Sequence, residues 1–66
     1  MAKELQEVIR VLRAQGKDVD KLEMSLRSEY RHNLNLQRSY RSEEDYVLSE
    51  LRQIGGRDAH LAIMTR

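Results

Sequence analysis

The sequence predicts an all-α fold, a helical hairpin with one short and one long helix. Proline is absent from the 66 residues, and the three glycines divide the chain into segments 1–15, 17–54 and 57–66. Glycine and proline are the strongest local breakers of regular structure, so the chain has few signals for ending a helix. In the first two segments apolar residues recur every three or four positions, which is typical of one helix face. We therefore predict one helical domain over residues 1–66.

The first segment predicts a short amphipathic helix from about residue 2 to about residue 14. Its apolar residues follow the i, i+3, i+4, i+7 spacing of one helix face: Leu5, Val8, Ile9 and Leu12. Gly16 suits the position just after a helix, where a left-handed backbone costs glycine little. Asp18 suits the N-cap of a following helix. Residues 15–18 are thus expected to form a tight turn between two helices.

The second segment predicts one long helix from about residue 19 to about residue 54. At about 100° per residue, seven apolar residues, two tyrosines and one asparagine of this segment fall within a single stripe. The stripe consists of Val19, Leu22, Leu26, Tyr30, Asn33, Leu36, Tyr40, Val47, Leu51 and Ile54. An alternative reading ends the helix near Ser42, because Ser42 with Asp45 three positions later resembles an N-cap box. The residues beyond Ser42 stay in phase with those before it, and this favours the single helix.

The third segment, residues 57–66, is expected to form a short C-terminal helical piece. Asp58 suits its N-cap. Three residues would then face inward over the last two turns of the long helix: Leu61, Ala62 and Met64.

The predicted helices differ greatly in length, and this difference implies a partner. A helix of about 36 residues spans about 54 Å, whereas about 13 residues cover only about 20 Å. The far half of the apolar stripe is therefore expected to need a second polypeptide over it. The residues assigned to this oligomer interface are Leu26, Asn33, Leu36, Tyr40, Val47, Leu51 and Ile54. A buried amide at Asn33 would fix the register of the partners, and an asparagine at a wet gap is the alternative.

The order of charges indicates that the second polypeptide is a like chain. The chain holds 12 basic and 11 acidic residues, so its overall charge is close to zero. Residues 27–41 contain four arginines and one acid, Glu29, while residues 43–50 contain four acids and no cation. Two long helices crossing antiparallel near Tyr40 would lay each basic stretch beside an acidic one. We expect a homodimer resembling a four-helix bundle, with a different protein as the alternative cover.

Four arginines form a second stripe on the predicted long helix, about 130° from the apolar one. This basic face consists of Arg27, Arg31, Arg38 and Arg41. Arg27 lies four residues after Glu23, and the two can pair on a helix. Arg41 lies four residues before Asp45 and has the same option. Arg31 and Arg38 lack such an acid, so they are the candidates for binding a partner's carboxylates or phosphates, with simple solvation as the alternative.

No catalytic, cofactor or metal site is predicted. Glu29 and His32 have the Glu-x-x-His spacing of di-iron bundles, but such a site also needs inward glutamates from other helices. Glu4 and Glu7 lie on the polar side of the first helix, so Glu29 and His32 are expected to form a surface pair. His60 has no nucleophilic partner that the sequence indicates. The chain is therefore not expected to be an enzyme.

The predicted function is a non-enzymatic helical protein–protein interaction module, such as a small adaptor, chaperone-like subunit or regulator. It would self-associate and present helix faces to a protein partner. The alternative is a small nucleic-acid-binding regulator that uses the arginine stripe. Tyr30 and Tyr40 are expected to pack on the apolar stripe rather than to stack on bases. No apolar run has the length of a signal-peptide core or a membrane span, so a soluble cytoplasmic protein is expected.

Overall fold

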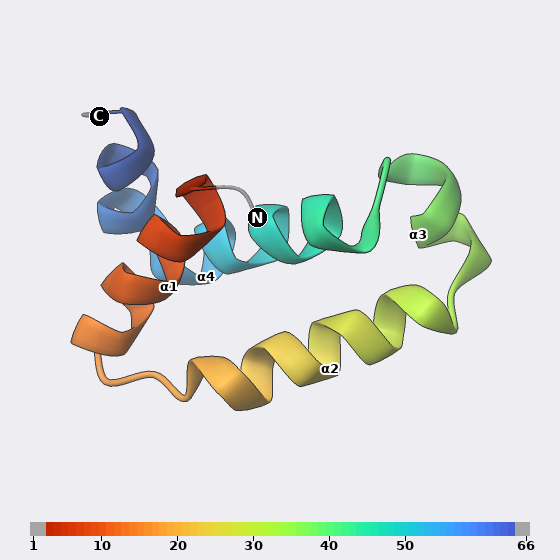
Figure 1. The fold of residues 1–66 in the computed structure, drawn as a ribbon, viewed down its shortest axis with the longest axis horizontal. Coiled ribbons are helices and arrows are strands. Elements are labelled where there is room, and N and C mark those ends of the chain that lie inside the picture. Colours follow the sequence, from red (N-terminus) through yellow and green to blue (C-terminus); the bar gives the residue numbers. More distant parts are fainter. Residues whose placement is uncertain (1–2, 65–66) are drawn as a thin grey trace.

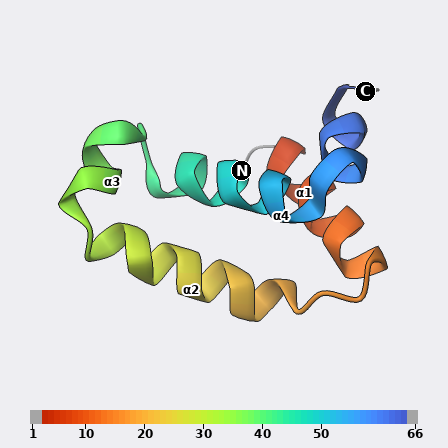
Figure 2. The same ribbon diagram turned by 180° about the vertical axis from the view of Figure 1, so that it is seen from behind.

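Four α-helices make up the described part of the chain, residues 3–64, in the computed structural model (Figure 1). They are α1 (Lys3–Ala14), α2 (Val19–Arg31), α3 (Leu34–Ser39) and α4 (Glu43–Met64). Residues 3–64 contain no strand, so the all-α prediction is confirmed. In both views α2 and the first part of α4 run antiparallel, α3 lies at the end that joins them, and α1 packs against α4 at the other end (Figure 1, Figure 2). None of the described helices is long and apolar enough to cross a membrane.

The turn between α1 and α2 forms where the sequence predicts it. The Lys17 N–H donates to the Leu12 carbonyl at 3.1 Å, the long-range bond of a Schellman motif. Gly16 adopts the left-handed backbone that this motif requires, with a φ of 81°. The Asp18 carboxylate then accepts a hydrogen bond from the Lys21 N–H at 3.2 Å and caps α2. Local signals therefore fix this turn.

The single long helix predicted over residues 19–54 is wrong, because the chain leaves helical geometry twice. The first break follows α2, where Asn33 has an extended backbone with φ −130° and ψ 105°. Its side-chain carbonyl accepts from the N–H groups of Asn35 at 3.0 Å and Leu36 at 3.2 Å, which caps α3. An asparagine side chain offers backbone N–H groups a partner outside the helix, and this competes with a continuous helix. Asn33 thus serves as an N-cap within the chain.

The second break lies between α3 and α4. Tyr40 has an extended backbone with φ −118° and ψ 145°. The Ser42 Oγ accepts from the Asp45 N–H at 3.2 Å, so the alternative reading of an N-cap at Ser42 is right. Helix continuity therefore does not explain why the apolar residues recur on both sides of the break. Because α2 and α4 border the same core, each needs an apolar stripe of its own.

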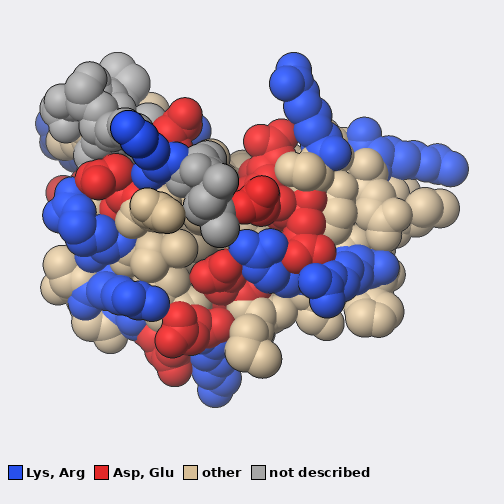
Figure 3. All heavy atoms as spheres, in the orientation of Figure 1, with Lys and Arg blue, Asp and Glu red and all other residues tan. Residues whose placement is uncertain are grey.

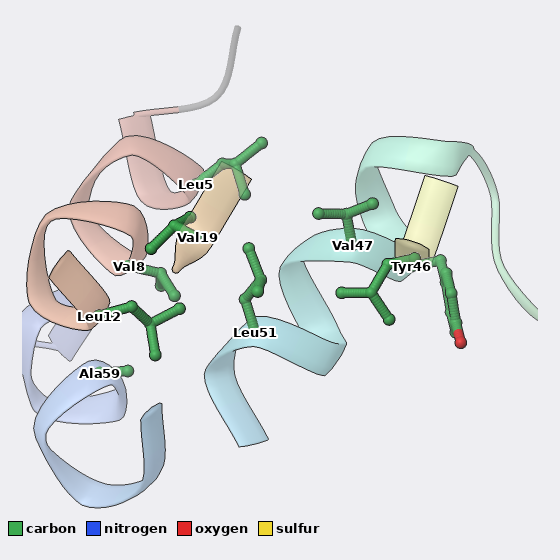
Figure 4. Packing of buried hydrophobic residues seen from close by; sticks show 9 residues of the cluster. Leu5, Val8, Leu12, Val19, Tyr46, Val47, Leu51 and Ala59 are labelled. Carbon is green, nitrogen blue, oxygen red and sulfur yellow. The ribbon is translucent and has the colours of Figure 1, made fainter. Parts of the chain in front are cut away.

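The turn back at residues 40–42 lets α4 close the core within one chain. The buried cluster consists of Leu5, Val8, Leu12, Val19, Leu26, Tyr46, Val47, Leu51 and Ala59. Figure 4 shows the α1 side chains on one side of this cluster, with Val47 and Leu51 of α4 facing them. Within the described residues, every buried side-chain nitrogen and oxygen has a hydrogen-bond partner. The core of this small domain is therefore apolar, and the polar groups at its edge are satisfied.

A kink at Gly56 divides α4, because the backbone of this residue has φ 69° and ψ −145°. After the kink the chain packs back against α1 (Figure 1). Ala59 is buried there, and it lies so near Gly55 that a Cβ added to Gly55 would be 2.6 Å from the Ala59 Cβ. Leu61, expected to face inward, is 43% exposed. The other two residues expected to face inward, Ala62 and Met64, lie outside the part of the chain whose side chains are described.

Candidate interaction surface

The residues predicted to form an oligomer interface are divided by the fold into a buried and an accessible group. Val47 and Leu51 have no exposed area and Leu26 is 9% exposed, so all three belong to the core of the chain itself. Leu36 and Tyr40 pack half-buried against this core. The expectation of a bare seam is therefore wrong for Leu26, Val47 and Leu51, because α4 folds over α2 instead of extending it. Ile54 is the member of the predicted interface that remains open, at 38% exposed.

Two of the four arginines in the predicted basic face are neutralised within the chain. Arg27 Nη1 lies 2.8 Å from Glu43 Oε2, and Arg31 Nε lies 2.8 Å from Glu43 Oε1. Arg27 also pairs with Glu23 at 2.8 Å, as predicted. Hydrogen bonds from Arg31 and then Arg27 hold the pKa of the Glu43 carboxyl below its usual range. The carboxylate partner of Arg31 is thus supplied by the start of α4, which the turn at residues 40–42 brings back to α2.

The other two arginines, Arg38 and Arg41, are exposed. Within the described part of the chain neither forms an ion pair or a side-chain hydrogen bond. The predicted pair of Arg41 with Asp45 does not form, because α4 begins at Glu43 and leaves Arg41 outside the helix. Figure 3 shows basic side chains projecting from the α3 end of the molecule. The four arginines therefore do not share one helix face.

Three tyrosines pack together where α2, α3 and α4 meet. The Tyr46 ring lies 5.9 Å from Tyr30 in a stacked arrangement and 5.1 Å from Tyr40 edge-on. Tyr46 is only 4% exposed, and its Oη donates to Glu29 Oε1 at 2.7 Å. Burial, followed by the hydrogen bond to Glu29, raises the pKa of Tyr46 well above its usual range. Tyr30 and Tyr40 pack against the core as predicted, whereas Tyr46 lies off the sequence stripe and was missed.

The Glu-x-x-His pair is occupied by other contacts. The Glu29 carboxylate accepts from Tyr46, and His32 Nδ1 lies 2.8 Å from the Ser28 carbonyl. Across the described residues, no three histidines or acids are grouped closely enough to hold a metal ion.

A shallow apolar hollow lies between the start of α2 and the middle of α4. We name it the α2–α4 groove; its volume is about 380 Å³ and its lining residues are Lys17, Asp18, Lys21, Leu22, Ser25 and Ile54. Leu22 and Ile54 supply the apolar surface, and Lys17 and Lys21 stand at its rim. Ser25 also lines an adjoining hollow beside Met24, whose side chain is 73% exposed. The two hollows therefore adjoin at Ser25, and Met24 is the apolar residue in the lining of the second.

Sequence reasoning found only part of this groove. Ile54 was assigned to an interface and Leu22 to the apolar stripe, but the two were not expected to be neighbours. Their proximity depends on α4 folding back over α2. Met24 did carry a signal, because it is a large apolar residue on the polar side of an amphipathic helix.

Comparisons with protein-family models, with characterised proteins and with solved structures find no match to this chain. Functional inference therefore starts from the geometry of its surface.

Proposed function

We propose that the chain is a non-enzymatic protein-interaction module that binds a protein partner through the α2–α4 groove. The observation that carries this proposal is the apolar hollow lined by Leu22 and by Ile54, which is 38% exposed, together with Met24, which is 73% exposed in the adjoining hollow. Single exposed apolar residues are ordinary on protein surfaces. Here, however, Leu22 and Ile54 line one hollow together with charged residues, and apolar surface bordered by charged and polar groups is the usual anatomy of a protein interface.

The side chains of this surface suit binding rather than folding. The core is closed without Met24 and Ile54, so their exposure leaves the fold intact. Methionine adapts to partners of different shape, because it is unbranched and polarisable, and it is common at protein-binding surfaces. This apolar surface lies outside the core, and a partner can cover it. It therefore supports an adaptor, chaperone-like or regulatory role.

Self-association of the chain stays a prediction. The first argument for it was an uncovered apolar stripe, and that argument no longer applies to Val47 and Leu51, which are fully buried in one chain. A like chain or a different protein would therefore bind at the exposed face of α2 and at Ile54.

A nucleic-acid-binding regulator is the second candidate, and it rests on Arg38 and Arg41. Both arginines are exposed and free of ion pairs in the region that the structure describes. Phosphate contacts by such side chains would give an affinity that falls steeply with salt. Two arginines supply few such contacts, and Glu43 holds Arg27 and Arg31. The protein-binding proposal is therefore the stronger of the two.

Site-specific photo-crosslinking in the source cells tests the proposed function. A photoreactive amino acid at Met24 should join the chain to one or a few discrete proteins, and the same group at Arg38 should not. Replacing Ile54 by serine in the Met24 crosslinker variant should abolish these products. Crosslinks to nucleic acid from position 38, with none to protein from position 24, would favour the second candidate. No product dependent on Ile54 at position 24 would overturn the proposal.

A further inference from the structure

We infer that the occupant of the α2–α4 groove is an acidic amphipathic helix of a different protein. This inference rests on the proposed function and specifies its partner. Three features carry it: the apolar residues that line the groove, the lysines in the same lining, and the position of the groove between α2 and α4.

The lining of the groove requires apolar side chains from its occupant. Leu22 is half-buried and Ile54 is 38% exposed, and both face the hollow of about 380 Å³. Covering such side chains stabilises a complex in proportion to the apolar area removed from water. A purely polar or phosphate-bearing ligand would leave this area without a matching surface. The occupant therefore contributes apolar anchors.

The rim of the groove favours negative charge on the occupant. Lys17 Nζ donates to the neutral Gln15 Oε1 at 3.2 Å, and neither Lys17 nor Lys21 forms an ion pair within residues 3–61. The one acid that lines the groove, Asp18, is engaged in capping α2. Asp20, close by in sequence, pairs with Arg13 at 3.2 Å. The lining thus carries two lysines without an ion pair against one capping carboxylate, and acidic residues that flank the apolar anchors would pair with these lysines.

The shape of the groove suits a helix. Its lining residues lie between Lys17 and Ser25 on one side and at Ile54 of α4 on the other, so the hollow is bordered by two helices. A helix lying in such a groove inserts apolar anchors at i, i+3 or i+4, and i+7, while its outer face stays polar. Acidic residues adjacent to these anchors would then reach the lysines at the rim.

A second copy of the chain fits this groove less well. The part of the chain that combines acidic and apolar residues lies at the start of α4. It surrounds a hollow whose lining includes Leu5, Leu48, Glu44 and Asp45. This hollow differs from the α2–α4 groove, so a copy docked through it would leave its own groove free. Such head-to-tail contacts add further copies unless the rotation closes a ring. A different protein that supplies one acidic helix gives a complex of defined size.

Two designed peptides test the inference with the full chain. Both carry leucines at i, i+3, i+4 and i+7; one has glutamates and the other has lysines at every flanking position. Fluorescence anisotropy should show about tenfold tighter binding of the acidic peptide, because its glutamates can form ion pairs with Lys17 and Lys21. Amide chemical shifts of the labelled chain should change at residues 17–25 and at Ile54.

A charge exchange supplies the decisive variant. Lys17→Glu combined with Lys21→Glu should reverse the preference, so that the lysine peptide binds more tightly. The matched control is Arg38→Glu with Arg41→Glu, which alters the net charge equally at the other end of the molecule and should keep the preference for the acidic peptide. Both pairs are exposed in the fold, and circular dichroism checks that each variant remains helical.

Several outcomes would overturn the inference. If neither peptide binds while the Met24 crosslinks persist, the partner is not an acidic helix and the proposed function stands. If both experiments are negative, the inference and the proposed function fail together. Loss of the acidic preference in the control pair would place anion binding at the α3 end. Growth into long oligomers that Lys17→Glu with Lys21→Glu prevents would identify a second copy as the occupant.

Discussion

The two ends of the molecule are held together by different interactions. We name the first the packed end, and its side chains are at most 1% exposed: Leu5, Val8, Leu12, Leu51 and Ala59. We name the second the polar corner, formed by Arg27, Arg31, Glu43, Glu29 and Tyr46 around the end of α2 and the start of α4. The neighbouring helix α3 has no buried residue at all. Apolar burial at the packed end is worth more than ion pairs near solvent, so we expect the polar corner to open first.

The largest effect is expected from Leu12→Ala at the packed end. Leu12 has no exposed area, and truncating such a residue commonly costs about 2–5 kcal/mol. This is a large part of the stability of so small a domain, so the variant should be largely unfolded at raised temperature. Urea unfolding followed by circular dichroism measures the loss. Met24→Ala is the control, since Met24 is 73% exposed and its truncation should change stability by less than about 0.5 kcal/mol. Similar losses in the two variants would place the core elsewhere.

A second large effect is expected from Gly55→Ala. The new methyl group would lie 2.6 Å from the Ala59 Cβ and 3.3 Å from Leu12 Cδ2, so helix and core must shift apart. Overpacking of this kind costs about 1–3 kcal/mol. Gly16→Ala isolates the backbone cost, because φ is 81° there and no atom lies within 4 Å of the added methyl. Thermal melts should show that Gly55→Ala lowers the melting temperature at least as much as Gly16→Ala does. An unchanged melting temperature in Gly55→Ala would contradict the close approach of the two parts of α4.

The sequence predicted the packed end better than the polar corner, and particular residues explain why. At the packed end, Leu5, Val8 and Leu12 follow one helical period, and Gly16 ends the helix through its own backbone. These signals are local, so they could be read without knowing the rest of the fold. The spacing of a few residues was enough for α1 and its turn.

The polar corner depends on two capping side chains that compete with the helical period. Asn33 and Ser42 both accept from backbone N–H groups. The continuous apolar stripe outweighs the Ser42 signal in the sequence, and Asn33 is read there as an interface amide and not as a cap. Once the chain turns at these residues, α4 returns to α2 and brings Ile54 beside Lys21. The α2–α4 groove is therefore a consequence of the fold. The prediction of one continuous helix over residues 19–54 places Ile54 far from Lys21, so it could not reveal this groove.

A smaller effect is expected from Tyr46→Phe in the polar corner. The substitution keeps the ring between Tyr30 and Tyr40 but removes the hydrogen bond to Glu29, which is 2.7 Å long. The Glu29 carboxylate can turn to water, so the loss should be about 0.5–1.5 kcal/mol in urea unfolding. Tyr30→Phe should lose less, because the Tyr30 Oη donates to the Tyr40 carbonyl over 3.4 Å. A loss in Tyr46→Phe as large as that in Leu12→Ala would remove the contrast between the two ends.

The smallest effect is expected from the charge of Glu43, and it depends on pH. Hydrogen bonds from Arg31 and Arg27 hold the pKa of Glu43 below its ordinary value of 4.5 in the folded chain. The unfolded chain therefore takes up a proton at this group before the folded chain does. The stability from these pairs is fully present above the ordinary pKa, and it is lost as the pH falls through the lowered one.

Glu43→Gln should remove this contribution, so the wild-type chain should exceed the variant in stability at pH 7 and lose that advantage in acid. The side chain of Arg31 is 67% exposed, and salt should reduce the difference at pH 7 by screening. Urea unfolding at several pH values measures both trends. Glu44→Gln is the matched control, because Glu44 is an exposed neighbour that forms no ion pair among the described residues. At pH 7 the Glu44→Gln variant should remain more stable than the Glu43→Gln variant, as the wild-type chain does. Parallel pH profiles of wild type and Glu43→Gln would mean that Glu43 does not hold the polar corner together in solution.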